Sequence, residues 1–159
     1  MHCASRSLQT LSFFGAKPLD DATIHLNSLR NMLEHNTTLE QLAIVHSQPS
    51  CEVLTEVCAG LKHNATVTCL RCEDAALHDE HIEVIAEMLL VNQGLTSLSL
   101  DMQYTEKGMA MLARALQSNN SMRHVSLQYV HSVLCSLSLS RAPCGAARQA
   151  IQSRGSRFN

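Results

Sequence analysis

The hydrophobic positions of this chain repeat with a period of about 28 residues. The pattern apolar-x-x-apolar-x-apolar occurs five times, and its first residues are spaced by 31, 28, 28 and 27 positions. The successive triplets are Leu8, Leu11 and Phe13; Leu39, Leu42 and Ile44; Val67, Leu70 and Cys72; Leu95, Leu98 and Leu100; and Met122, Val125 and Leu127. Alternating apolar positions over so short a stretch are typical of a strand with one buried face. The pattern therefore predicts five short β-strands.

A second apolar series keeps the same register between these strands. Its residues come in pairs four positions apart, so each pair lies on one face of a helix. The pairs are Leu29 and Leu33, Val57 and Leu61, Ile85 and Leu89, and Leu112 and Leu116. Two series with one period indicate a β-α repeat. We expect four to five parallel strands on one side and helices near 23–35, 52–63, 80–91 and 106–118 on the other.

Asparagines follow the repeat too, three residues before four of the strand patterns, at Asn36, Asn64, Asn92 and Asn119. At a helix-to-strand turn, asparagine suits left-handed backbone angles. Three of these asparagines also begin N-glycosylation sequons, but their periodicity favours a structural role. The sequon hydroxyls can bond the same turn, and they belong to Thr38, Thr66 and Ser121.

The helix starts are marked by side chains that favour the first turn. Asp79 and Thr105 are residue types that cap helix N-termini, and each stands just before a glutamate. Pro49 and Ser50 mark the corresponding loop of the preceding unit. These residues predict where the helices begin.

The unit from residue 95 to 121 reads LTSLSLDMQYTEKGMAMLARALQSNNS. Its strand, loop, Glu-x-Gly helix start and Leu-Ala-x-Ala-Leu helix resemble the ribonuclease-inhibitor-like leucine-rich repeats, as in the C-terminal repeats of NOD-like receptors. The resemblance covers about residues 8 to 130. It implies an α/β leucine-rich-repeat solenoid, a horseshoe segment with parallel strands on the concave face and helices on the convex face. It also implies a non-catalytic protein–protein interaction module.

The chain departs from that family at the loop after each strand. The family places Asn or Cys three residues past the last apolar strand position, where this chain has Ser47, Ala75, Gln103 and Val130. After Tyr129 the repeat pattern decays. We therefore divide the chain into an N-terminal tail (1–7), leucine-rich repeats (8–130, about four to five units of 27–31 residues) and a degenerate or frayed C-terminal segment (131–159). Because terminal units normally need caps, we expect a piece of a longer solenoid or an alternative gene product.

Composition excludes several classes of function. Among 159 residues, 12 Lys and Arg stand against 14 Asp and Glu, so no basic field favours nucleic acid. No apolar run approaches the roughly 20 residues that span a membrane. Seven scattered cysteines, an odd number, favour free thiols in a reducing compartment, and hence a cytoplasmic protein.

Two pairs of residues could hold a metal. Cys69 and Cys72 have Cys-x-x-Cys spacing, but in a strand they face opposite sides of the sheet. His78 and His81 share a helix face, yet no third ligand is placed beside them. The six glycines are isolated, and no nucleophile elbow, P-loop or dinucleotide loop is present. We therefore expect no enzyme, no metal and no cofactor.

A partner is expected on the concave face, formed by side chains that alternate with the core residues. The predicted contact residues are Gln41, Arg71, Glu73, Ser99, Asp101, His124 and Gln128. Glu73 and Asp101 occupy the same position in consecutive units, and neighbouring strands lie about 4.8 Å apart. Two adjacent carboxylates repel, so we expect a basic protein ligand that relieves the repulsion.

Two classes of function follow. The favoured one is a protein-interaction module that is a fragment of a larger NOD-like receptor or scaffold. The alternative is a cytoskeletal or ciliary leucine-rich-repeat scaffold, with a metal-binding or enzymatic protein that uses the Cys and His pairs as a less favoured reading.

Overall fold

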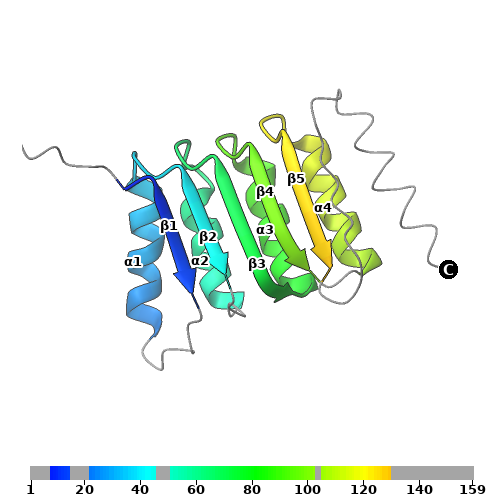
Figure 1. The fold of residues 1–159 in the computed structure, drawn as a ribbon, viewed down its shortest axis with the longest axis horizontal. Coiled ribbons are helices and arrows are strands. Elements are labelled where there is room, and N and C mark those ends of the chain that lie inside the picture. Colours follow the sequence, from blue (N-terminus) through cyan, green and yellow to red (C-terminus); the bar gives the residue numbers. More distant parts are fainter. Residues whose placement is uncertain (1–7, 15–21, 46–50, 103–104, 130–159) are drawn as a thin grey trace, which may run out of the picture.

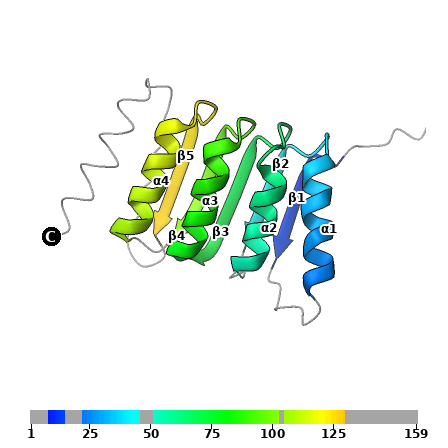
Figure 2. The ribbon, with the colours of Figure 1, turned by 180° about the vertical axis from the view of Figure 1, so that it is seen from behind.

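The computed structural model forms two layers, a five-stranded parallel sheet and a row of helices that covers one of its faces (Figures 1 and 2). It describes residues 8–14, 22–45, 51–102 and 105–129. In chain order the elements are β1 (Thr10–Phe14), α1 (Ala22–His35), β2 (Gln41–Val45), α2 (Cys51–Leu61), β3 (Cys69–Leu77), α3 (Asp79–Val91), β4 (Ser97–Met102), α4 (Glu106–Ser118) and β5 (His124–Tyr129). The predicted α/β architecture is confirmed, and each predicted helix agrees with the observed one within two residues.

The strands lie side by side in chain order and in the register that the repeat predicts. Leu42 pairs with Leu70, Leu70 with Leu98 and Leu98 with Val125. These side chains are buried because each strand turns every second residue toward the helices. No helix in the described ranges is long and apolar enough to cross a membrane. Among the described residues, no helix covers the other face of the sheet (Figure 1), and we call it the open face.

The core lies between the sheet and the helices. Leu98 from β4 and Leu112 from α4 are 1% and 0% exposed, as the apolar register predicts. The helix residues Leu33, Leu61 and Leu89 are fully buried as well. Removing these apolar surfaces from water provides the main driving force for stacking one unit on the next.

The four repeated asparagines form a ladder at the helix-to-strand turns. The Asn64 Nδ2 donates to the main-chain oxygens of Leu33 (2.6 Å) and Asn36 (3.0 Å) in the preceding turn. Its Oδ1 accepts from the amides of Thr66 (2.9 Å) and Val67 (2.8 Å) in its own turn. A side-chain amide can do both because it carries two donor hydrogens and an acceptor oxygen.

The next two units repeat this arrangement. Asn92 donates to the oxygens of Leu61 and Asn64, and Asn119 to those of Leu89 and Asn92. The expected left-handed backbone is wrong, since φ is −65° at Asn92 and −81° at Asn119. Asparagine occupies these positions for its hydrogen bonds and not for its backbone freedom.

The pairing of β3 with β4 is interrupted beyond Cys72. The register pairs Cys72 with Leu100 and resumes at Leu77 with Met102, which is five positions along β3 against two along β4. Such an irregularity changes which side chains face the same surface. The predicted pairing of Glu73 with Asp101 lies in this interrupted stretch and is not formed.

The starts of α3 and α4 are capped differently. Thr105 is the predicted N-cap of α4, and its hydroxyl accepts from the Gly108 amide at 2.9 Å. The prediction for Asp79 is wrong, because α3 begins at Asp79 and His78 is its N-cap. Asp79 instead accepts a hydrogen bond from the Thr105 hydroxyl, which links the two helix starts.

Candidate functional site

The open face presents six of the seven side chains predicted to contact a partner. Those of Gln41, Arg71, His124 and Gln128 are exposed, and those of Glu73 and Ser99 are half-buried. The sheet register places Arg71 between Ala43 on β2 and Ser99 on β4. The centre of this surface is therefore one long charged side chain flanked by two small residues.

Arg71 and Glu73 form an ion pair within β3. The Arg71 Nε and Nη2 donate to the Glu73 Oε1 at 2.8 and 2.6 Å, and the two side chains are 50% and 29% exposed. So exposed a pair contributes little to stability. It leaves the centre of the open face close to neutral in net charge.

Asp101 does not belong to this surface. It is only 6% exposed, although alternation along β4 predicts an outward side chain. Asp101 lies where the register between β3 and β4 is interrupted, so the expected alignment with Glu73 is absent. Because Arg71 binds Glu73 and Asp101 is buried, these two carboxylates do not form the exposed pair that was expected to attract a basic ligand. Whether the remaining residues contact a partner stays a prediction.

The cysteine pair has the predicted geometry. Cys72 is fully buried in the core, whereas Cys69 is half-buried on the open face. Burial, followed by the nearby charges of Asp101 and Glu73, raises the pKa of Cys72 to about 12, and burial also raises the pKa of Cys58. Both thiols stay protonated at neutral pH and are poor nucleophiles. In the unfolded chain the two thiols ionise near their ordinary pKa of 9.0. Burial of the neutral thiols therefore stabilises the fold fully below pH 9, and this stabilisation is lost as the pH rises above 9.

The histidine pair serves the helix start. The rings of His78 and His81 have centroids 6.0 Å apart, and the His81 Nδ1 accepts from the His78 amide at 3.2 Å. Within residues 8–14, 22–45, 51–102 and 105–129, no group of three or more His, Cys, Asp and Glu side chains could hold a metal ion.

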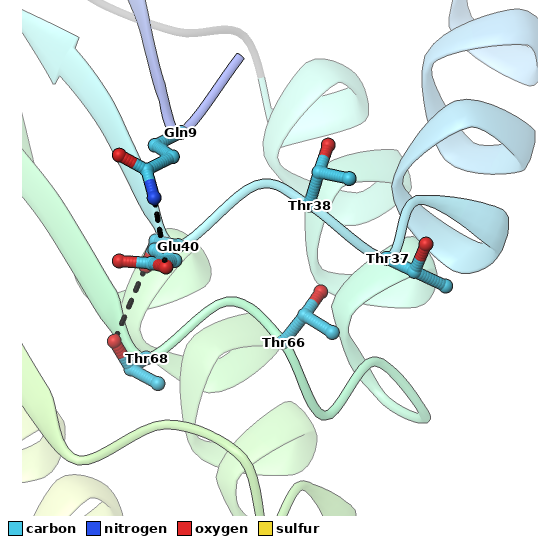
Figure 3. A pocket seen from close by; sticks show the side chains of 6 residues that line it. All are labelled: Gln9, Thr37, Thr38, Glu40, Thr66 and Thr68. Carbon is cyan, nitrogen blue, oxygen red and sulfur yellow. Dashed lines mark hydrogen bonds between the residues drawn. The ribbon is translucent and has the colours of Figure 1, made fainter. Parts of the chain in front are cut away.

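A shallow pocket of about 420 Å³ lies at the N-terminal edge of the sheet, where the strands begin. Its walls come from three successive units (Figure 3), and we call it the threonine pocket: Gln9, Thr37, Thr38, Glu40, Thr66 and Thr68. The Gln9 amide donates to the Glu40 carboxylate at 3.2 Å. Sequence reasoning placed Thr38 and Thr66 in the turns but missed the pocket. The available signal was their common position, two residues after a ladder asparagine.

Among known proteins, similarity to this chain was found in solved structures. No family model matches the chain, and no curated protein matches it. A structure of "Leiomodin-1 Actin-Binding Site 2 (ABS2)" is similar over 92% of this chain and 77% of its own length, with 20% identity and a TM-score of 0.61. The tropomodulin C-terminal domain of Caenorhabditis elegans is similar over 83% of this chain and 92% of its own length, with 17% identity and a TM-score of 0.57. This chain shares their fold.

These matches correct the family resemblance. The resemblance of about residues 8 to 130 to the ribonuclease-inhibitor-like repeats of NOD-like receptors is wrong, because the two structures named above are leiomodin and tropomodulin domains. The sequence departs from the NOD-like pattern at the loop after each strand, and the structure differs in the same respect. The asparagine ladder lies before the strands at the helix-to-strand turns, whereas the NOD-like pattern expects its polar residue after each strand.

Proposed function

We propose that this chain is a protein-binding module of the cytoskeleton and that its partner is actin. The observation that carries this proposal is the shared fold over 92% of the chain with a leiomodin domain whose name describes an actin-binding site. The tropomodulin domain, similar over 83% of the chain, supports the same class of protein. This is the cytoskeletal scaffold that the sequence offered as its alternative.

The finer architecture belongs to the same proposal. Residues 8–130 are the repeat domain, a leucine-rich-repeat solenoid with the open face as its concave wall. The expected degenerate or frayed segment (131–159) falls outside the described residues. The module acts by binding and not by catalysis, in the cytoplasm where actin filaments are found. The repeated strand register and the ladder support this description.

The contact surface in this proposal is the open face around Arg71. Small neighbours at Ala43, Ser97, Ser99 and Ser126 allow a partner to approach the sheet closely. Arg71 is half exposed, and arginine is enriched among residues that dominate protein interfaces. Gln41, His124 and Gln128 provide further exposed polar groups at the rim.

Co-sedimentation of the full chain with actin filaments, with a parallel assay on monomeric actin, tests the proposal. We expect binding that weakens at least tenfold in Arg71→Glu and changes less than twofold in Arg114→Glu. Arg114 is an exposed residue of α4 on the helical layer, so it controls for the change in charge. Thermal unfolding of both variants checks that they fold.

The two parts of the proposal fail separately. Absence of binding to both forms of actin would exclude actin as the partner. Binding that Arg114→Glu weakens and Arg71→Glu does not would place the contact on the helical layer.

A further inference from the structure

We propose that the threonine pocket binds a guanidinium group, supplied by an arginine side chain of a protein partner. The pocket is separate from Arg71 and the open face, and the inference does not rest on the actin proposal. It rests on the hydrogen-bonding capacity that the pocket walls leave unused.

The threonine hydroxyls of the pocket present acceptors. Thr66 donates its proton to the Asn36 carbonyl at 3.0 Å, and Thr68 to the Glu40 carbonyl at 3.3 Å. Thr38 donates to the Leu8 carbonyl at 3.4 Å. A hydroxyl has one proton and two lone pairs, so each of these oxygens is left able to accept. The walls therefore suit a ligand rich in N–H donors.

Glu40 adds a negative charge to these acceptors. Its Oε1 accepts from the Gln9 amide, and the carboxylate lies between Gln9 and Thr68, with the other threonines on the other side of the pocket (Figure 3). No Lys or Arg is among the described residues that line the pocket, so no cation within it neutralises Glu40. A cationic ligand would form the charge-assisted hydrogen bonds that this carboxylate can accept.

The neighbouring helices favour the same sign of charge. α1 ends at His35 and α2 at Leu61, immediately before the turns that supply Thr37, Thr38 and Thr66. A helix carries partial negative charge at its C-terminus, which attracts cations and repels anions. Carboxylate, hydroxyl oxygens and helix ends thus all select a positive group.

Guanidinium fits the spread of acceptors better than ammonium does. The acceptors come from three successive units and are distributed around an open pocket. Guanidinium offers five N–H donors in a planar fork, whereas ammonium is a compact, strongly hydrated point charge. We therefore commit to arginine over lysine.

NMR titration of the full chain with N-acetyl-L-argininamide tests the site. We expect shifts concentrated at the amides of Thr37, Thr38, Thr66 and Thr68, and at least tenfold weaker binding in Glu40→Gln. The matched control is Thr96→Val. Thr96 donates the same kind of hydroxyl bond, to the Thr68 carbonyl at 3.2 Å, but does not line the pocket. It should leave binding within twofold of the unmodified chain.

Two further probes separate the source of the cation. N-acetyl-L-lysinamide should bind at least threefold more weakly, and spermidine, a free polyamine, should bind no more tightly than argininamide. Shifts scattered outside the pocket, or binding that survives Glu40→Gln, would overturn the site. Equal binding of the lysine probe would overturn the guanidinium assignment, and tighter binding of spermidine would overturn the protein source.

Discussion

The two edges of the sheet, where the strands begin and where they end, are held by different kinds of hydrogen bonds. At the N-terminal edge, where strands begin, the three ladder asparagines after Asn36 each bind two carbonyls of the preceding turn and two amides of their own. At the C-terminal edge, where helices begin, α3 is capped by His78 and α4 by Thr105. A single residue separates β3 from α3, whereas three separate β4 from α4.

The difference explains why the sequence repeats where it does. A ladder asparagine must reach groups in two consecutive turns, so its spacing is held at 28, 28 and 27 residues. A helix cap needs only the first turn of its own helix, so its residue type and connection length can vary. The periodic asparagines therefore form hydrogen bonds between units, whereas the variable cap residues form their capping hydrogen bonds within one unit.

The largest effect should come from removing a ladder asparagine inside the stack. Asn92→Ala leaves two carbonyls and two amides without their partners at a position 1% exposed, so we expect a loss of roughly 3 to 6 kcal/mol in unfolding free energy. Asn36→Ala, at a half-buried position, should cost about 1 to 2 kcal/mol. Urea unfolding measures both, and equal losses would show that the bonds between units contribute little.

A smaller effect should come from the close approach of two turns. A Cβ at Gly94 would lie 2.7 Å from the Ala65 Cα and from the Asn64 carbonyl oxygen, both main-chain atoms that cannot rotate away. Gly94→Ala should therefore destabilise by about 1 to 3 kcal/mol. Ser121, at the same position of the next unit, already has a Cβ, so Ser121→Ala is the control and should cost less. A Gly94→Ala variant as stable as the unmodified chain would mean that the N-terminal edge adjusts more readily than we infer.

The smallest effect should come from the C-terminal edge. Thr105→Ala removes the cap of α4 and the hydrogen bond to Asp79, and we expect a loss of about 1 kcal/mol. Thr105→Ser keeps a hydroxyl and should restore most of the stability. Thermal unfolding compares the two variants. A loss in Thr105→Ala as large as that in Asn92→Ala would remove the distinction between the edges.

Local sequence pattern was sufficient for the fold. Two apolar series, spaced by two residues along each strand and by four along each helix, place every described strand and helix, because core burial depends on the spacing of residues within one unit. The same alternation correctly turns Cys69 and Arg71 away from the core. It also locates the asparagines, although the reason it suggests, a left-handed backbone, is wrong.

The candidate sites needed information that one unit does not contain. Asp101 is buried where β3 and β4 change register beyond Cys72, and that change depends on how two strands fit together. The Arg71 and Glu73 pair could have been anticipated, since residues two apart on a strand share a face. The threonine pocket could not, because its walls meet only when three units stack.

The asparagine ladder is incompatible with N-glycosylation of Asn64 or Asn119 in the secretory pathway. The nitrogen of Asn64 or Asn119 that would carry a sugar in a sequon is the atom that donates to two main-chain oxygens of the preceding turn, at positions 4% and 2% exposed. A glycan attached during secretion, before folding, would replace one of the two donor hydrogens and place a sugar between two turns that pack closely. For this fold, glycosylation at either residue and correct stacking of the units exclude each other.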